Sequence, residues 1–299
     1  IGSKRKGVAQ MLQRFTFLQS ISYLRRVMSS STDKTNKNIN MRYVDQHCYG
    51  YIDSIETPEG EKIGLVKNLA LSSYVTLNMP EQVSIIKNIL SDVDYIYGFD
   101  IPLTYYKTMA KIFINGEWIG FTNRAFKLIN FLKEKRFNGE INRNVGFVYK
   151  ESTNKDTREI RINTDGGRLI RPLLKVVDNE LVITKEILAK INNNYYDIPD
   201  AINSLNQLLT EYPGVIEYVD VEESTNACIA MYARDVADNY EAANEVIDGP
   251  NERGDLVNRY NKLYKRYTHC EIHPMLMLGS VSSNIVLMEH NQSPRNYYY

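Results

Sequence analysis

An Asn-Gly pair between two short apolar runs constrains the fold of this chain more than any other sequence feature. Ile112 and Ile114 precede Asn115-Gly116, and Trp118 follows them. Asn-Gly is typical of two-residue hairpin turns, because Asn tolerates and Gly readily adopts the positive φ that these turns need. The sequence therefore predicts an antiparallel β-hairpin over residues 111–121.

Helices and further strands are predicted on both sides of this hairpin. Apolar spacing indicates helices over residues 80–90 and 123–137, the first opened by a proline and the second closed by a glycine that can form a left-handed cap. Strands are predicted over residues 146–149, 159–163, 169–177, 215–219 and 227–232, with Asp165-Gly166-Gly167 and the acidic residues 220–223 as turns. The pattern predicts a mixed α+β fold.

The other segments are predicted to be helical or irregular. The apolar spacing of residues 7–28 indicates one amphipathic helix, followed by a basic loop at residues 33–40 and a tight turn at Glu56-Thr57-Pro58-Glu59-Gly60. Further helices are predicted over residues 184–191, where Thr184 can cap, 199–211 and 233–265. A length of 299 residues suggests two or three modules.

The charge of the chain is balanced overall but uneven along its length. The 36 Lys and Arg residues equal the 36 Asp and Glu residues, so composition alone does not indicate a nucleic-acid binder. Residues 4–42 are basic with Asp33 as their one acid, whereas residues 217–255 are strongly acidic. This asymmetry suggests an N-terminal segment near a polyanion and an acidic segment that faces solvent or a basic protein.

Cysteine and histidine usage gives no disulfide or metal pattern. Three widely separated cysteines favour a reducing compartment. His269, Cys270 and His273 lack the spaced second pair of a structural zinc site, so no metal ligands are assigned. No apolar run approaches the roughly 20 residues of a membrane span. Both ends of the sequence are predicted to be cuts inside a longer protein.

Two cationic segments are candidates for phosphate binding. Arg25-Arg26 precedes the basic loop, and guanidinium groups can fork onto phosphate oxygens while a loop follows a moving strand. The alternative is an exposed helix end, where cations complement the helix dipole. In residues 290–296, Pro294 stiffens a turn that aims Arg295 at a phosphate or ribose; the alternative is a polar surface loop.

Taken in order, the segments resemble the second-largest subunit of multisubunit DNA-dependent RNA polymerases. The resemblance rests on Gly7-Val8-Ala9-Gln10-Met11-Leu12-Gln13-Arg14, Leu24-Arg25-Arg26-Val27, Glu56-Thr57-Pro58-Glu59-Gly60, Gly64-Leu65-Val66-Lys67-Asn68-Leu69, Asp165-Gly166-Gly167-Arg168-Leu169-Ile170-Arg171-Pro172-Leu173 and the run at 290–296. It is closer to the eukaryotic, archaeal and large-DNA-virus versions than to the bacterial one. Asn296-Tyr297-Tyr298 departs from the family's usual Asn-Thr-Tyr, which favours a divergent viral or plasmid-like lineage over an ordinary nuclear enzyme.

The resemblance implies a series of modules. We expect a helical fork region at residues 1–75, two small α/β external domains at residues 76–180 and 181–265, and the incomplete start of a β-rich hybrid-binding domain at residues 266–299. The complete enzyme would join ribonucleotides on a DNA template as a nucleotidyltransferase. The chain by itself is expected to be inactive, and no catalytic residue is assigned to it.

The resemblance also implies roles for particular residues. Arg295 is expected to bind the nucleoside triphosphate, with Tyr298 close by. Gln10 and Arg14 are expected to line the channel near the RNA–DNA hybrid, and Arg25 and Arg26 to lie by the downstream edge of the transcription bubble. Glu59 is expected to fix the geometry of the loop behind the fork by hydrogen bonds.

Partners and cofactor follow from the same resemblance. The expected partners are the largest subunit, smaller subunits, the DNA template, the hybrid and nucleoside triphosphates, with no membrane. Mg²⁺ would be held by aspartates of the largest subunit. The expected location is intracellular, in the nucleus, or in the host cytoplasm or virion of a virus. Two alternatives stay open: a non-catalytic scaffold derived from a polymerase, and a free-standing single-strand-binding module.

Overall fold

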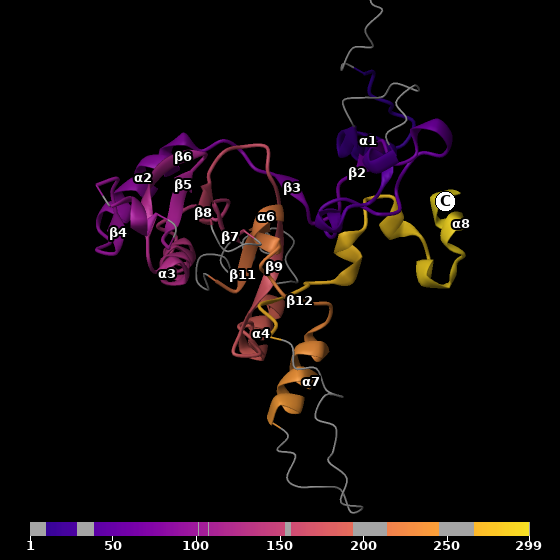
Figure 1. The fold of residues 1–299 in the computed structure, drawn as a ribbon. Coiled ribbons are helices and arrows are strands. Elements are labelled where there is room, and N and C mark those ends of the chain that lie inside the picture. Colours follow the sequence, from indigo (N-terminus) through magenta and orange to yellow (C-terminus); the bar gives the residue numbers. More distant parts are fainter. Residues whose placement is uncertain are drawn as a thin grey trace, which may run out of the picture. The chain divides into compact units, whose positions relative to one another are not determined.

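The computed structural model describes residues 10–28, 39–100, 102–106, 108–152, 157–193, 214–244 and 266–298. The chain divides into two compact units (Figure 1). The terminal unit comprises Ile1–Tyr74 and Met275–Tyr299, and the inserted unit comprises Val75–Pro274. Helices and strands occur in both units, which confirms a mixed α+β chain with several sheets. The predicted module boundaries stay predictions.

The first sheet of the inserted unit has five strands in the order β4-β6-β5-β8-β7. β5 and β8 are parallel, and the other neighbours are antiparallel. Its strands are β4 (Ile96–Tyr97), β5 (Ala110–Ile114), β6 (Glu117–Thr122), β7 (Gly146–Glu151) and β8 (Arg158–Asn163). The helices of this part of the chain are α2 (Pro80–Ser91), η4 (Leu103–Tyr105) and α3 (Ala125–Phe137). The predicted helices and strands of this part of the chain are confirmed.

The predicted hairpin is formed by β5 and β6. Asn115 and Gly116 have φ values of 49° and 87°, so both turn positions use the left-handed region that the Asn-Gly pair allows. The Asn115 side chain donates to Thr164 Oγ1 at 2.8 Å and accepts from the Thr164 backbone N–H at 2.8 Å. These bonds tie the turn to the end of β8.

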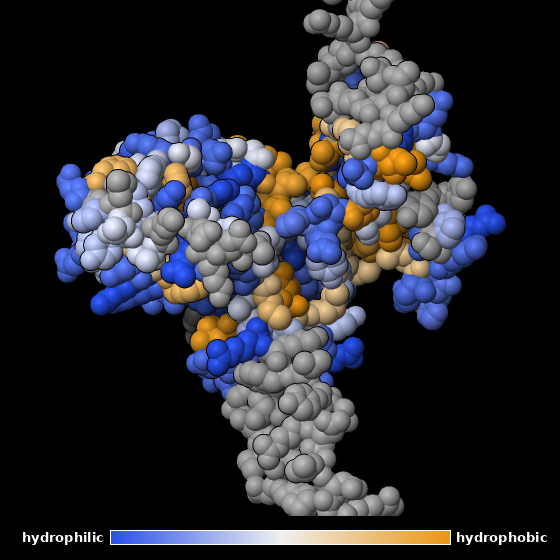
Figure 2. Space-filling view, viewed as in Figure 1, coloured by the Kyte–Doolittle hydropathy of each residue, from blue (hydrophilic) through white to orange (hydrophobic). Residues whose placement is uncertain are grey.

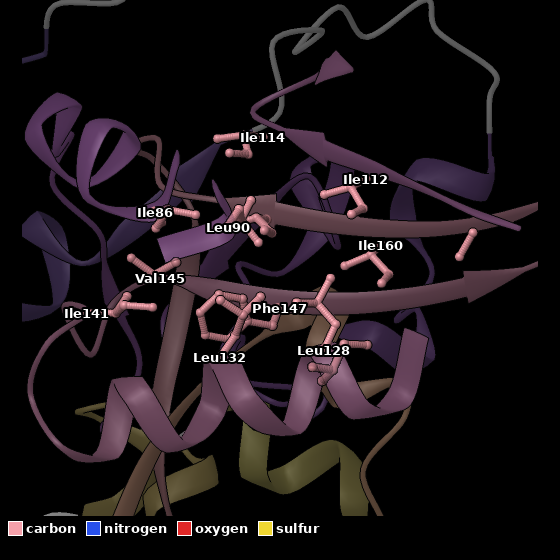
Figure 3. Close-up of a cluster of buried hydrophobic side chains, with 13 residues drawn as sticks. Ile86, Leu90, Ile112, Ile114, Leu128, Leu132, Ile141, Val145, Phe147 and Ile160 are labelled. Atoms are coloured by element: carbon pink, nitrogen blue, oxygen red, sulfur yellow. The ribbon is translucent and has the colours of Figure 1, made fainter. Parts of the chain in front are cut away.

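Helices α2 and α3 pack their apolar residues against this sheet (Figure 3). Ile86 and Leu90 come from α2, and Leu128 and Leu132 come from α3. They are buried together with inward-facing strand residues such as Ile112 of β5. Burial of this apolar surface is the main stabilising term of this half of the unit.

The second sheet of the inserted unit runs in the order β10-β9-β13-β12, with β11 also paired to β9. Its strands are β9 (Leu169–Val177), β10 (Glu180–Leu181), β11 (Ile216–Asp220), β12 (Ile229–Ala230) and β13 (His269–Cys270). The helices beside it are α4 (Lys185–Asn193), α6 (Val221–Ser224) and α7 (Ala233–Asn244). The Leu188 N–H donates to the Thr184 carbonyl at 3.1 Å, and α4 starts at Lys185, directly after the predicted cap residue Thr184.

The terminal unit combines segments from both ends of the sequence. α1 (Phe17–Leu24) is followed by β1 (Arg26–Met28), which pairs antiparallel with β2 (Val66–Asn68). The Leu71 N–H donates to the Leu278 carbonyl at 2.8 Å and so joins the two segments. The remaining elements are η1 (Ile39–Arg42), η2 (Gln46–Cys48), η3 (Gly60–Lys62), η6 (Pro274–Met277), η7 (Ser282–Asn284), η8 (Met288–His290) and α8 (Ser293–Tyr298). The short strand β3 (Tyr74–Val75) spans the division between the units and pairs with β9.

The predicted N-terminal helix is wrong at both ends within the described residues. Residues 10–16 are not helical, because the Thr16 side chain caps a helix that starts only at Phe17, accepting from the Gln19 N–H at 3.1 Å. At the other end, Val27 pairs with Lys67 in a β-ladder instead of extending the helix. Tertiary pairing overrides the helical spacing here.

Three other predictions change or lie outside the described residues. Residues 221–224, part of the predicted acidic turn, form α6, because the Asp220 carboxylate accepts from the Glu223 N–H at 2.7 Å and caps it. Residues 293–296, predicted as part of a turn, belong to α8 (Ser293–Tyr298). The helix predicted over residues 199–211, most of the basic loop at 33–40 and residues 245–265 lie outside the described part of the chain. In the part that is described, no helix is long and apolar enough to cross a bilayer.

Candidate functional site

The two predicted arginines at the end of α1 have different environments. Arg25 is half-buried, and its Nη2 donates to the carbonyl oxygens of Ala70 at 2.5 Å and Ser73 at 2.9 Å. These bonds hold the turn that follows β2. Arg26 is exposed in β1, and its guanidinium carbon lies 4.8 Å from the centre of the Tyr23 ring. Arg26 therefore presents a charge to solvent, whereas Arg25 supports the backbone behind it.

Gln10 lies beside this arginine pair. Tyr23 donates its hydroxyl hydrogen to Gln10 Oε1 at 2.7 Å, and Gln10 Nε2 donates to Met28 Sδ at 2.9 Å. Because Tyr23 also packs under Arg26, a polar amide and a guanidinium are brought together on one exposed surface. Arg14 is exposed in the non-helical segment before α1.

The Glu56-Thr57-Pro58-Glu59-Gly60 motif is a hydrogen-bonded loop. Thr57 Oγ1 donates to the Val66 carbonyl at 3.1 Å and accepts from the Gly64 N–H at 2.9 Å. A Cβ at Gly64 would lie 2.8 Å from the Cα of Arg42, so the close approach requires glycine. Glu59 is exposed and precedes η3 without a side-chain cap. Thr57 thus ties the loop to Val66 and Gly64, and the role predicted for Glu59 stays a prediction.

A buried carboxylate that the sequence reasoning missed lies beside this loop. Asp53 is 4% exposed and accepts from the Ile55 N–H at 2.9 Å, from the Gly279 N–H at 2.7 Å and from the Ser282 hydroxyl. An acid between the apolar residues Ile52 and Ile55 was the available signal, because a buried charge needs several partners.

Glu56 lies next to Asp53. Its Oε1 accepts from the Ser22 hydroxyl of α1 at 2.6 Å, and its backbone carbonyl accepts from Asn68 Nδ2 at 3.1 Å. Burial and the nearby charge of Asp53 raise the pKa of Glu56, although the Ser22 hydrogen bond, the Val281 backbone N–H and the charge of Arg26 oppose that rise. The surroundings of Glu56 therefore disfavour the charged form of its carboxyl group.

The predicted triphosphate residue lies in the same unit as the arginine pair. Arg295 is exposed in α8, and its backbone N–H donates to the Gln292 carbonyl at 2.8 Å. Asn296 Nδ2 donates to the Met288 carbonyl at 3.2 Å, which fixes the start of α8 against η8. Tyr298 is the last residue of α8.

A second charged cluster is buried in the inserted unit, between α3 and the second sheet. The Arg136 guanidinium donates to the carboxylates of Glu217 and Glu223, the latter at 3.0 Å, and to the Val145 carbonyl at 2.7 Å. Lys133 lies 2.9 Å from Glu223, and His269 Nε2 lies 3.0 Å from Glu217. Each carboxylate has at least two cationic or polar partners, whereas the buried Nε of Arg136 has no hydrogen-bond partner among the described residues.

Electrostatics explain why these carboxylates stay charged. Burial by itself would raise the pKa of Glu217, but the hydrogen bond from His269 and the charges of Arg136 and Lys133 hold it well below its usual range. Burial raises the pKa of Glu223, the charges of Arg136 and Lys133 lower it, and the net shift is again downward. Sequence reasoning assigned no role to this cluster, because its members are far apart in sequence.

The His269, Cys270 and His273 segment has a structural environment. His269 bonds to Glu217, and burial is the largest cause that raises the pKa of the Cys270 thiol to about 11, which disfavours a metal-binding thiolate. No group of three or more metal-ligating side chains lies together within the described residues.

Comparisons with known proteins identify the family. Models described as RNA polymerase Rpb2 domain 3, domain 4 and domain 5 match residues 10–75, 112–177 and 206–274, in that order along the chain. The chain belongs to the family of second-largest subunits of multisubunit RNA polymerases. The resemblance stated from the motifs is therefore confirmed.

Individual relatives agree with this assignment. DNA-directed RNA polymerase subunit 2 of Acanthamoeba polyphaga mimivirus is 40% identical over 98% of the chain and 24% of its own length. The RPB2 subunit of RNA polymerase II from Encephalitozoon cuniculi is 35% identical over 98% of the chain and 23% of its own length. The Rpo2 subunit of Sulfolobus acidocaldarius is 29% identical, also over 98% of the chain and 23% of its own length. The chain thus spans about a quarter of the length of the curated relatives it matches.

Proposed function

We propose that this chain acts within a DNA-directed RNA polymerase, as a part of its second-largest subunit, in template-directed RNA synthesis from ribonucleoside triphosphates. The collinear match of three successive domains of that subunit carries the proposal. The terminal unit supports it, because it combines the arginine pair, the Glu56-Thr57-Pro58-Glu59-Gly60 loop and Arg295 in one compact body.

The roles that we propose for individual residues follow their environments. Arg26, Gln10 and Arg14 are exposed and contact nucleic acid, Arg26 through a guanidinium that can bind phosphate. The contact predicted for Arg25 is proposed to be indirect, since its Nη2 is engaged by backbone carbonyls. Arg295 binds the nucleoside triphosphate, with Tyr298 near it.

The partners are the largest subunit, smaller subunits, the DNA template and the RNA–DNA hybrid. Hydrophobic side chains at the surface support burial against partner subunits (Figure 2). Phe15, before α1, and Phe17, its first residue, are 85% and 82% exposed. Mg²⁺ serves the complete enzyme as a Lewis acid, and we propose that residues of the largest subunit hold it. The location that we propose is intracellular, in the nucleus, or in the host cytoplasm or virion of a virus.

The test is single-nucleotide addition by the assembled polymerase that contains this chain. Arg295→Ala removes a charge-assisted hydrogen bond to phosphate, so we expect the apparent KM for the incoming nucleotide to rise about ten-fold or more. Arg295→Lys keeps the charge and should retain part of the affinity. Lys62→Ala, which removes an exposed cation of η3 in the same unit, serves as the matched control.

Two results would contradict these proposals. Unchanged kinetics in Arg295→Ala, with unchanged Lys62→Ala, would exclude the triphosphate role of Arg295. An assembly that contains the largest subunit and binds template yet adds no nucleotide would favour the scaffold alternative over the enzyme.

A further inference from the structure

The segment that carries Arg295 is joined to the rest of the terminal unit by hydrogen bonds near its start. Leu276 and Leu278 accept backbone hydrogen bonds from Ser72 and Leu71, at 3.4 and 2.8 Å. After these, Gly279 and Ser282 donate to the buried carboxylate of Asp53. Asp53 is 226 and 229 residues away from them in sequence, so this anchor is entirely tertiary.

Beyond Ser282, the hydrogen bonds found among the described residues are local. Asn284 Nδ2 donates to the Ser280 carbonyl at 2.7 Å, and Asn296 Nδ2 donates to the Met288 carbonyl at 3.2 Å. The segment consists of short turns rather than a long helix or strand, and Leu287 adopts a left-handed φ of 48°. The bonds to Asp53 are therefore the last long-range hydrogen bonds before Arg295 that the described residues show.

Glu56 extends this anchor to α1. It accepts from the Ser22 hydroxyl at 2.6 Å, and α1 ends directly before Arg25 and Arg26. A Cβ added at Gly279 would collide with Glu56 Oε2 and lie 2.8 Å from Asp53 Oδ2, so both carboxylates lie against the same glycine. One pair of acids therefore contacts the segment of Arg295 on one side and the helix of the arginine pair on the other.

We propose that Asp53 and Glu56 are positioning residues for nucleotide addition. They hold the Arg295 segment in a fixed position relative to α1 and the arginine pair that follows it. This proposal rests on the triphosphate role proposed for Arg295. The two acids touch neither nucleotide nor nucleic acid in this scheme. They act through the Gly279 backbone and the Ser282 hydroxyl on one side and through Ser22 on the other.

The decisive variant is Asp53→Asn in the assembled polymerase. Asparagine keeps the size of the side chain but offers one acceptor oxygen in place of two, so in either orientation of the amide an N–H that Asp53 accepts from, that of Ile55 or that of Gly279, loses its acceptor. We expect the apparent KM for the incoming nucleotide to rise about ten-fold, since a small displacement of a binding group weakens its contact strongly. The kcat at saturating nucleotide should change less than about two-fold, because only nucleotide binding is affected.

Ser282→Ala is the second variant, since it deletes one donor to Asp53 and leaves the Gly279 bond intact. It should raise KM in the same direction by a smaller factor, and it keeps the proposal testable if Asp53→Asn fails to fold. Amide exchange measured by mass spectrometry on the assembled enzyme should show faster exchange in peptides covering residues 275–298 in both variants. This readout does not depend on activity.

The chain offers matched controls in the same unit. Asp45→Asn makes the same substitution at an exposed carboxylate that caps η2 by accepting from the His47 N–H at 2.9 Å. Ser283→Ala removes the hydroxyl of the neighbouring serine. The Ser283 hydroxyl donates only a local hydrogen bond, to the Ser280 carbonyl at 3.4 Å. Neither control should change KM or the exchange of residues 275–298.

The coupling between Asp53 and Arg295 separates the possible outcomes. If Asp53 acts through Arg295, Asp53→Asn should raise KM no further in an Arg295→Ala background. Additive effects of the two substitutions, or an Asp53→Asn enzyme with normal KM and normal exchange, would overturn the positioning role while leaving the role of Arg295 intact. If Arg295→Ala itself leaves KM unchanged, the proposed triphosphate role fails instead. In that case, faster exchange in Asp53→Asn would reduce the acid pair to a structural anchor.

Discussion

Arg136→Met should destabilise the inserted unit through the charges that it leaves behind. Arg136 is 3% exposed, and its guanidinium donates to Glu217, Glu223 and the Val145 carbonyl. Methionine has a similar volume, so the main effect is loss of the positive charge and its donors rather than a cavity. After the substitution, two carboxylates that are nearly inaccessible to solvent keep Lys133 and, at Glu217, the hydrogen-bonded His269 as neighbours within 4 Å.

The size of the effect follows from these contacts. Removing one partner of a buried ion pair costs about 3–5 kcal/mol, and leaving a buried carbonyl without its donor costs about 1–3 kcal/mol. Lys133 offsets part of this cost, because it lies 2.9 Å from Glu223 and 3.6 Å from Glu217. We therefore expect a loss of about 4 kcal/mol in the free energy of unfolding.

Urea unfolding of the chain followed by the fluorescence of Trp118 measures this loss. Trp118 is the single tryptophan of the chain and lies in β6, in the sheet that α3 covers. The triple variant Arg136→Met, Glu217→Gln, Glu223→Gln also removes the negative charges of the two carboxylates and should recover most of the stability. Arg234→Met, at an arginine whose side chain is 74% exposed, should change it by less than about 0.5 kcal/mol.

The pH dependence gives an independent check of the same reasoning. In the wild type the pKa values of Glu217 and Glu223 lie below the ordinary 4.5, so the stability they contribute is present above pH 4.5 and is lost as the pH falls. Without Arg136, burial dominates and raises both pKa values, so the variant gains stability on acidification. A loss below about 1 kcal/mol, or a difference between the two proteins that does not narrow at acidic pH, would refute the argument.

Two further predictions concern the terminal unit. Arg26→Ala should reduce the slope of log affinity against log salt concentration, for nucleic-acid binding by the assembled polymerase, by about 0.9, the value for one lost phosphate contact. Arg234→Ala, at an arginine whose guanidinium packs on Tyr232 in a similar way, should leave this slope unchanged. An unaltered slope in Arg26→Ala would make Arg26 an ordinary surface cation. Glu56→Gln should increase amide protection of residues 51–70 at pH 7 more than at pH 4.5. The raised pKa of Glu56 means that wild-type stability is lost as the pH rises above 4.5, and the amide cannot ionise. Equal protection changes at both pH values would contradict this explanation.

Local sequence signals predicted the first half of the inserted unit well. The Asn115-Gly116 turn, the proline that opens α2 and the glycine that follows α3 act within a few residues, and their expected conformations are present. The N-terminal helix failed because β1 pairs with a strand that starts about forty residues later. A long-range ladder of this kind leaves no periodic signature in a helical-looking segment.

The candidate site shows the same division between local and long-range information. Motifs identified the Arg25-Arg26 pair and Arg295, but no pattern indicated that Arg25 would donate to Ala70 and Ser73. Asp53 was not identified, because its partners Gly279 and Ser282 lie more than 220 residues further along the chain. A buried acid in an apolar run predicts that partners exist but does not say which ones.

The buried charges of the inserted unit have a consequence for how the protein is made. Arg136 is matched by Glu217 and Glu223, 81 and 87 residues later, and the equally buried Arg171 is matched by Glu271, 100 residues later. During synthesis on the ribosome, α3 and β9 emerge well before the acids that neutralise them. The nascent chain therefore cannot complete the ion pairs of Arg136 until residue 223 has left the exit tunnel, or that of Arg171 until residue 271 has left it.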